Sequence, residues 1–220
     1  ICREFTDKVI HQEWLGYARQ KNLAIDRTTG DWVLSLDADE PLETELAEEI
    51  RSIIASPSSR DGYWIPRKTI FLGQWIKYGG WYPDLNLRLF RRGKGRFKDR
   101  AVHEAICVEG SIGTTTHSIV HHTYPDIASY MARISTYSTL AVDVMAEKGV
   151  GGFKASWLNI IARPVLTFVH KYFLRLGFLD GKHGLILNLF HSYYVFAKYA
   201  KAWERRNRNT MMRSDEQVSK

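Results

Sequence analysis

The sequence predicts an α/β fold, in which a Rossmann-like mixed sheet is followed by a C-terminal helical segment. Between residues 8 and 55, apolar runs typical of strands alternate with amphipathic helical patterns. Residues 61–124 contain aromatic and β-branched runs broken by glycine, which are typical of hairpins. Residues 153–206 then carry two helical patterns rich in leucine, phenylalanine and tyrosine.

The first four elements are expected to be strand, helix, strand and helix. Residues 8–11 are a candidate strand, and residues 14–27 have apolar side chains at helical spacing. Residues 31–37 form an apolar strand, and Pro41 suits the first turn of the helix that follows. One face of that helix collects the apolar positions Leu42, Leu46, Ile50, Ile53 and Ile54. This order is typical of a parallel α/β sheet.

The second half of the chain predicts a long helix and a change of domain. The helix is expected to begin after Asp126, whose carboxylate can cap it. Three glycines between residues 149 and 152 indicate a linker. We therefore expect a partial α/β domain at 1–148 and an amphipathic helical region at 149–206. The polar tail at 207–220 is expected to be disordered.

The first helical pattern after the linker has polar and cationic side chains along one arc. These are Asn159, Arg163, His170, Lys171 and Arg175. A helix that spans a bilayer needs about 20 mostly apolar residues, so these charges argue against a span. A helix that lies in the membrane interface tolerates such a face and gains from anionic lipid. A helical hairpin packed on the main domain or on a second protomer remains an equal alternative.

Composition limits the class of partner. The chain has 220 residues, 45% of them hydrophobic, and a net charge of +7. This charge suits an anionic partner such as an acidic membrane surface or a phosphorylated substrate. Nucleic acid is not expected, because the basic residues form no recognition motif. Cys2 and Cys107 fit neither a disulfide framework nor a zinc pattern, which indicates a reducing compartment.

The stretch "GDWVLSLDADE" delivers three acids at the end of an apolar strand. In α/β sheets, ligands bind outside the carboxyl ends of the strands, which is where Asp37 and Asp39 are expected to lie. Magnesium and manganese prefer oxygen ligands, and magnesium typically takes one or two carboxylates beside substrate phosphates. Glu40 or Asp39 also suits the cap of the next helix. The sequence therefore predicts a divalent metal site at this strand end.

The order of several motifs resembles the inverting family 2 glycosyltransferases of GT-A fold, in particular the branch that adds sugars to lipopolysaccharide cores. The motifs are "QKNLAID", "GDWVLSLDADE", "GGWYPDLNLRLFRR" and "VHE". The later stretch "RPVLTFVHKYFLRLGFLDGKHGL" is similar to the membrane-associated tail of that branch. The family's first strand and acidic nucleotide-binding loop have no counterpart here, so an N-terminal βα unit is expected to be missing.

The resemblance implies transfer, with inversion, of a sugar from a nucleoside diphosphate donor, most simply a UDP-sugar, with Mg²⁺ or Mn²⁺ as cofactor. The implied metal ligands are Asp39, Asp37 and His122, with His121 a weaker candidate. The implied donor-binding residues are Asp37, Lys21, Asn22 and Arg88. An inverting transfer also needs a carboxylate that takes the proton of the acceptor hydroxyl. Asp84, close after Trp81, is the preferred base, and Glu104 is the rival.

Two other functions remain open from the sequence. A haloacid dehalogenase-like phosphatase also ends a strand with Asp-x-Asp, although this chain has no later Asp-Asp pair. A non-catalytic carbohydrate-binding or membrane module is the third reading. The transferase reading places the protein peripherally on the cytoplasmic face of a bacterial inner membrane, where its acceptor is a lipid-linked saccharide. The oligomeric state is not predicted.

Overall fold

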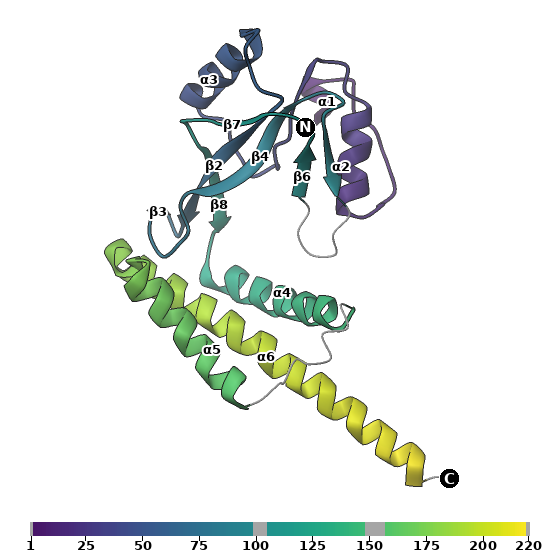
Figure 1. The fold of residues 1–220 in the computed structure, drawn as a ribbon, viewed down its shortest axis with the longest axis vertical. Helices are drawn as coiled ribbons and strands as arrows, with labels where there is room; N and C mark the ends of the chain where they lie inside the picture. The colour runs from purple at the N-terminus through teal and green to yellow at the C-terminus, as the bar shows by residue number, and fades with distance from the viewer. Residues whose placement is uncertain (1, 99–104, 148–156, 219–220) are drawn as a thin grey trace.

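The computed structural model describes residues 2–98, 105–147 and 157–218, with residue 2 and residues 209–218 described by their backbone alone. An α/β layer contains the sheet and the helices α2 and α3, and the long helices α4, α5 and α6 form a second layer (Figure 1). The chain passes from the first layer to the second through β8, which leads directly into α4 (Figure 1). The expected mixed α/β architecture with C-terminal helices is confirmed.

The main sheet is mixed, and β2 is its central strand. Its strands are β1 (Trp32–Leu34), β2 (Gly62–Phe71), β3 (Gln74–Ile76), β4 (Asp84–Arg91), β7 (Ile112–Thr114) and β8 (Ile119–Tyr124). The order β1-β4-β2-β3 is antiparallel throughout, whereas β7 and β8 pair with β2 in parallel. A separate hairpin joins β5 (Gly95–Lys98) to β6 (Ala105–Val108). The hairpins expected after residue 61 are therefore present.

The expectation that neighbouring strands run parallel is wrong for β1. This strand pairs antiparallel with β4, and β4 pairs antiparallel with β2. It follows that β1 and β2 do run in the same direction, joined by α3 as a crossover, but β4 lies between them. The order of elements along the chain predicts the crossover and cannot reveal a later strand that inserts into it.

The N-terminal elements are shorter than the sequence predicts. Residues 8–11 form no strand, since they are mostly exposed and pair with none of the described strands. Helix α1 (Cys2–Phe5) precedes them, and α2 (Tyr17–Asp26) begins only after Gly16. Gly16 has φ 91°, a left-handed conformation that a helix cannot include. The apolar strand expected at 31–37 is regular only at β1.

Helix α3 (Thr44–Ala55) covers the sheet with one face, as its periodicity predicts. Leu46 and Ile50 are buried against Ile65 and Leu89 of the sheet. Leu42 lies before the helix and is 38% exposed, and Ile54 is 45% exposed. Two of the five positions expected on the apolar face, Leu42 and Ile54, are therefore not part of the buried face.

The second layer is built from α4 (Ile127–Glu147), α5 (Trp157–Val169) and α6 (Gly181–Val218). The Ser129 N–H donates to Asp126 Oδ1 at 2.7 Å, which confirms the predicted cap. Tyr130 of α4 and Leu187 of α6 share one buried cluster with Phe71 and Ile76 of the sheet. Helix α4, assigned to the first domain from sequence, therefore also packs with the C-terminal helices. The predicted linker glycines lie outside the described residues.

Between α5 and α6 the chain makes a π-helical turn (His170–Leu174) and a 3₁₀ turn (Gly177–Asp180). Helix α6 continues to Val218, and the disorder expected for residues 207–220 stays a prediction. Arginine, methionine, glutamate and glutamine have high helix propensity, and extending a helix costs less than starting one. Within the part of the chain that the structure describes, no helix has the length and apolar character needed to cross a bilayer.

The packing of α3 gives a direct test of the fold. Ile50→Ala should lower the free energy of unfolding by about 2–5 kcal/mol, because it leaves a cavity under the sheet. Ile54→Ala removes the same atoms one turn later from an exposed position and should change stability by only about 0.5 kcal/mol. Urea unfolding followed by circular dichroism measures both. Equal losses from the two variants would contradict this orientation of α3.

Candidate functional site

The three acids after β1 occupy a tight turn and have different environments. The Glu40 N–H donates to the Asp37 carbonyl oxygen at 3.1 Å, and the Asp37 N–H donates to Glu40 Oε2 at 3.1 Å. The side chain of Glu40 is completely buried, whereas those of Asp37 and Asp39 are 38% and 50% exposed. The turn thus fixes one acid inward and leaves Asp39 facing solvent.

Arg88 of β4 is the buried partner of this turn. Its Nη2 donates to Glu40 Oε1 at 2.6 Å and to Asp37 Oδ2 at 2.9 Å. The sheet brings these groups together, because β4 lies beside β1 and the Ser35 N–H donates to the Arg88 carbonyl oxygen at 2.8 Å. Burying a charge is costly unless it is paired, and here Glu40 supplies the partner that the buried Arg88 requires.

Lys21 reaches Asp37 from α2. Its Nζ lies 2.9 Å from Asp37 Oδ1, so the carboxylate is held by two cations. Partial burial acts to raise the pKa of Asp37, but Lys21 and Arg88 outweigh it and hold this pKa below its usual range. The ion pairs therefore add stability at neutral pH, which is lost only as the pH falls through the lowered pKa.

Arg67 of β2 links the turn to Asp84. Its Nε and Nη2 lie 2.8 Å and 2.6 Å from Asp84 Oδ2, and its Nη1 lies 3.8 Å from Glu40 Oε1. Asp84 is the first residue of β4 and Arg67 is its partner in the register of β2. Opposite charges thus alternate without a break from Asp84 through Arg67, Glu40 and Arg88 to Asp37.

A cavity of about 340 Å³ opens beside these residues. Its polar lining includes Lys21, Asp37, Arg67 and Arg88. Its remaining lining comprises Trp64, Leu85, Asn86, Leu87, Phe97, Ala105 and Ile106. The volume is at the lower end of the range for small-molecule sites, and guanidinium groups match phosphate oxygens in geometry. The cavity can therefore receive an anionic group such as a diphosphate.

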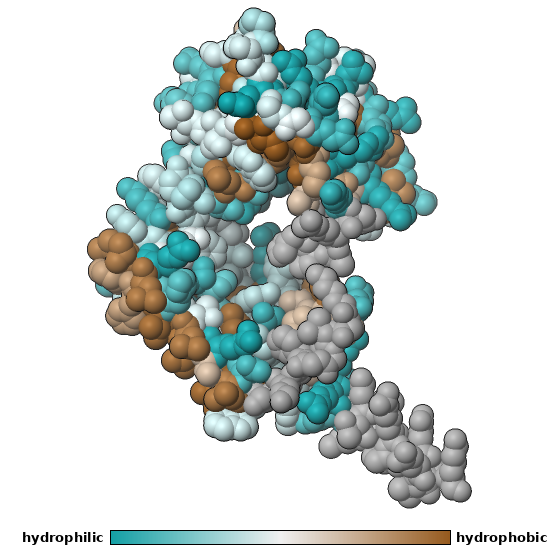
Figure 2. Space-filling model, viewed as in Figure 1, coloured by the Kyte–Doolittle hydropathy of each residue, from teal (hydrophilic) through white to brown (hydrophobic). Residues whose placement is uncertain are grey.

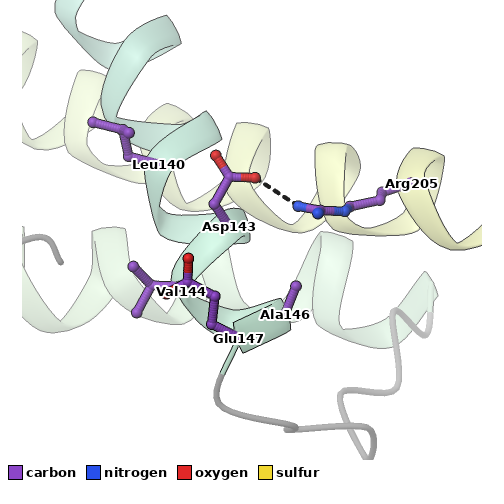
Figure 3. Close-up of a pocket in the computed structure, with 6 residues that line it drawn as sticks. All are labelled: Leu140, Asp143, Val144, Ala146, Glu147 and Arg205. Carbon is purple, nitrogen blue, oxygen red and sulfur yellow. Dashed lines mark hydrogen bonds and ion pairs between the residues drawn. The ribbon is translucent and has the colours of Figure 1, made fainter.

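A larger hollow of about 530 Å³ lies between α4 and α6, but it has only one cationic side chain, which is paired with an exposed acid (Figure 3). It is lined by Leu140, Asp143, Val144, Ala146, Glu147 and Arg205. Arg205 Nη1 lies 2.6 Å from Asp143 Oδ1, and this exposed pair joins the two helices (Figure 3). Size alone therefore does not identify the site, and we place it at the acids after β1.

The predicted metal ligands are not gathered as the sequence implied. Among the residues that the structure describes, no three His, Cys, Asp or Glu side chains are grouped so that they could hold a metal ion. His122 is exposed, and successive residues of a strand point to opposite faces. His121, the less favoured residue, lies beside the acids, with Nδ1 3.7 Å from Asp39 Oδ2.

His121 and Asp39 are neighbours that could contribute two ligands to a divalent cation. His121 Nδ1 is buried and has no hydrogen-bond partner in the described structure. Burial, and then the Arg67 guanidinium, lower the pKa of His121, so its imidazole is neutral at pH 7. A neutral imidazole and a carboxylate are both metal ligands, and substrate phosphates commonly complete the coordination of Mg²⁺.

Two other predicted residues have different outcomes. The side-chain amide of Asn22 donates to the Phe97 carbonyl oxygen and accepts from the Phe97 N–H, at 2.9 and 3.0 Å. Asn22 thus ties α2 to β5, and its contact with a nucleotide stays a prediction. Glu104 lies outside the described residues.

The two residues that connect the site are not among the predicted site residues. Glu40 is expected only as a possible cap of the next helix, and Arg67 has no expected role. A signal for Arg67 does exist, because Arg67 and Lys68 are the two charged residues in the mostly apolar strand run "GYWIPRKTIF". A charge within such a run requires a buried partner.

Comparisons with known proteins find relatives that are named glycosyltransferases. The chain is 30% identical over 205 residues to "Lipopolysaccharide core biosynthesis glycosyltransferase LpsC" of Rhizobium meliloti (strain 1021), covering 90% of this chain and 73% of that protein. It is 26% identical to an uncharacterized glycosyltransferase of Rickettsia typhi, covering 93% and 73% of the two chains. A Rickettsia felis glycosyltransferase is 24% identical, covering 98% and 80%. No protein family model matches the chain.

The buried pair predicts an unequal response to two similar substitutions. Glu40→Gln keeps the shape of the side chain but leaves Arg88 with a weaker partner, and it should lower stability by about 3 kcal/mol. Glu43→Gln removes an exposed pair with Lys68 at 3.8 Å and should cost less than about 1 kcal/mol. Urea unfolding at pH 7 compares them. If Glu40→Gln is as stable as Glu43→Gln, Arg88 does not depend on Glu40.

Proposed function

We propose that this chain, which belongs to the glycosyltransferase family of LpsC from Rhizobium meliloti, transfers a sugar from a nucleoside diphosphate donor to a lipid-linked saccharide. The protein is a glycosyltransferase, as its relatives are. The observation that supports the donor is the cavity where Lys21, Arg67 and Arg88 meet the acids after β1. Lipopolysaccharide core is the acceptor that the name of LpsC favours.

In this proposal the diphosphate of a UDP-sugar lies against the cations of the cavity. Before the donor binds, Asp37 holds the side chains of Lys21 and Arg88 in place, and the phosphates then also bind these two cations. Asp39 and His121 would hold Mg²⁺ or Mn²⁺, with Asp37 close enough in sequence to contribute. The bound ion would stabilise the negative charge that develops on the leaving diphosphate.

Asp84 is the proposed general base of an inverting transfer. The acceptor oxygen attacks the anomeric carbon, the bond from that carbon to the diphosphate breaks, and the hydroxyl proton passes to the Asp84 carboxylate. Arg67 binds only Oδ2 of Asp84, so Oδ1 remains for the acceptor hydroxyl. Glu104 is retained as the alternative base. The phosphatase and non-catalytic alternatives are not favoured, because the relatives are named glycosyltransferases.

We further propose that the second layer binds the surface of an anionic membrane, as a peripheral protein on the cytoplasmic face of a bacterial inner membrane. Figure 2 shows an apolar strip that follows α5 and the turn toward α6. Its most exposed members are Trp157, Ile161, Leu166 and Leu174, at 72%, 59%, 63% and 71% exposure. Residues 157–208 contain nine Lys and Arg against two Asp and Glu. Apolar and cationic groups together favour anionic lipid.

Substitution of the proposed base tests the reaction. Asp84→Asn should lower the transfer rate by about 100- to 10,000-fold, because the acceptor proton has no base to receive it. Binding of the nucleotide sugar should be retained. Transfer is measured with lipid-linked saccharide, a panel of nucleotide sugars and Mn²⁺, and binding by calorimetry. Asp26→Asn, which loses an exposed pair with Arg96, is the control.

The comparison with Glu104 completes this test. Glu104→Gln should leave most of the transfer rate intact. Loss of transfer in Glu104→Gln with full activity in Asp84→Asn would assign the base to Glu104 instead. Full activity in both variants would reject a carboxylate base at either position.

Binding to vesicles tests the membrane proposal. Leu174→Ser should weaken binding to vesicles that contain phosphatidylglycerol about tenfold, because burial of one leucine side chain is lost. Leu42→Ser, at an exposed leucine of the α/β layer, is the matched control and should bind as the wild type does. Co-sedimentation of each variant with vesicles at low and at high salt separates the apolar contribution to binding from the electrostatic one. Unchanged binding of Leu174→Ser would exclude this surface.

A further inference from the structure

The loop of residues 77–83, which joins β3 to β4, lies against the turn between α5 and α6. Asp180, the last residue of the 3₁₀ turn, accepts two backbone hydrogen bonds from it. The Lys77 N–H donates to Asp180 Oδ1 at 3.2 Å, and the Tyr78 N–H donates to Oδ2 at 2.8 Å. Asp180 is only 5% exposed, so these bonds are shielded from water.

Further contacts tie the same loop to the helical layer. The Gly79 N–H donates to the Arg175 carbonyl oxygen at 2.8 Å, and Lys171 Nζ donates to the Gly79 carbonyl oxygen at 3.2 Å. The Lys171 ammonium also lies 5.3 Å from the centre of the Trp81 ring. Gln74 Nε2 donates to the Asp180 carbonyl oxygen at 3.1 Å, which adds a contact at the start of β3.

The loop depends on these contacts for its shape. Gly79 and Gly80 both have positive φ, 70° and 76°, a conformation that other residues rarely adopt. A Cβ on Gly79 would lie 3.2 Å from the Asn188 side chain of α6, so the loop approaches the helix closely. Glycine-rich segments are mobile unless other groups hold them. Here residues 171–180 hold the first half of the loop, at Lys77, Tyr78 and Gly79. The second half also contacts His191 through Trp81 and Ser118 through Tyr82.

The same loop leads into the proposed catalytic base. Trp81 is three residues before Asp84, and Asp84 opens β4 directly opposite Arg67. A shift of the loop would therefore move Trp81 and the start of β4 together. Misplacement of a reacting group by about 1 Å can cost a factor of 100 in rate, so such a shift matters for catalysis.

We propose that Asp180 is a positioning residue, which fixes the loop of residues 77–83 and through it the acceptor side of the active site. The helical layer is then a working part of this glycosyltransferase as well as a surface for binding lipid. This inference rests on the proposed function, since it takes Asp84 as the base. Asp180 touches neither substrate nor the reacting atoms and acts through the loop alone.

An isosteric substitution separates this role from packing. In D180N one carboxylate oxygen becomes an amide nitrogen, which cannot accept the N–H of Lys77 or Tyr78. The side chain keeps its size, so the turn between α5 and α6 should still fold. D143N makes the same chemical change in the exposed pair with Arg205 that joins α4 to α6 (Figure 3).

Two measurements on the full chain test the proposal. Hydrogen exchange read at single amides should be about tenfold faster in D180N than in the wild type at Lys77 or at Tyr78, whichever amide faces the new nitrogen and loses its acceptor. The kcat for transfer to the saccharide should fall about tenfold, while the KM for the nucleotide sugar and the hydrolysis of the donor stay unchanged. D143N should alter none of these quantities.

Several results would overturn the inference. One is an unchanged rate of hydrogen exchange at both Lys77 and Tyr78 in D180N. Another is a kcat for transfer in D180N that equals the kcat of D143N. A parallel loss of donor hydrolysis, donor binding and melting temperature would show a structural role only. A wild type that transfers no sugar from any donor would contradict the proposed function, whereas the exchange rates decide separately whether Asp180 fixes the loop.

Discussion

The buried guanidinium of Arg88 is the constraint on which the site depends. It lies on β4 between the carboxylates of Glu40 and Asp37, which belong to the turn after β1. A buried charge without a partner is strongly destabilising, so the turn cannot open without a large cost. Because Glu40 and Asp39 are adjacent in one hydrogen-bonded turn, the side chain of Asp39 points to solvent when that of Glu40 points into the protein.

This constraint gives the cavity its chemical character. Three cations converge there, and carboxylates of the protein already pair with each of them. Such pairs hold long side chains in position before a ligand arrives, which lowers the ordering cost when phosphates bind. The proposed base belongs to the same network through Arg67, so donor and acceptor groups are positioned by one set of charges. The helical layer adds a second control, because its turn holds the loop that precedes Asp84.

Part of this arrangement follows from the sequence. Acids at the end of an apolar strand, a lysine in the helix before it and an arginine after Asp84 were all expected in the site, and the structure brings Lys21, Asp37 and Arg88 together. The Glu40–Arg88 pair was not foreseeable, since its members are 48 residues apart and meet only because β4 inserts beside β1. Whether His121 or His122 faces the acids depends on the register of β8, because a shift of one residue moves each side chain to the other face of the sheet.

Binding of UDP in the presence and absence of Mn²⁺, measured by isothermal titration calorimetry, tests the proposed diphosphate site. Mn²⁺ should tighten the binding of UDP to the wild type, and Asp39→Asn should lose this gain while it still binds UDP weakly. The same affinity with and without Mn²⁺ in the wild type, or a full gain in Asp39→Asn, would contradict a metal-assisted diphosphate site at the end of β1.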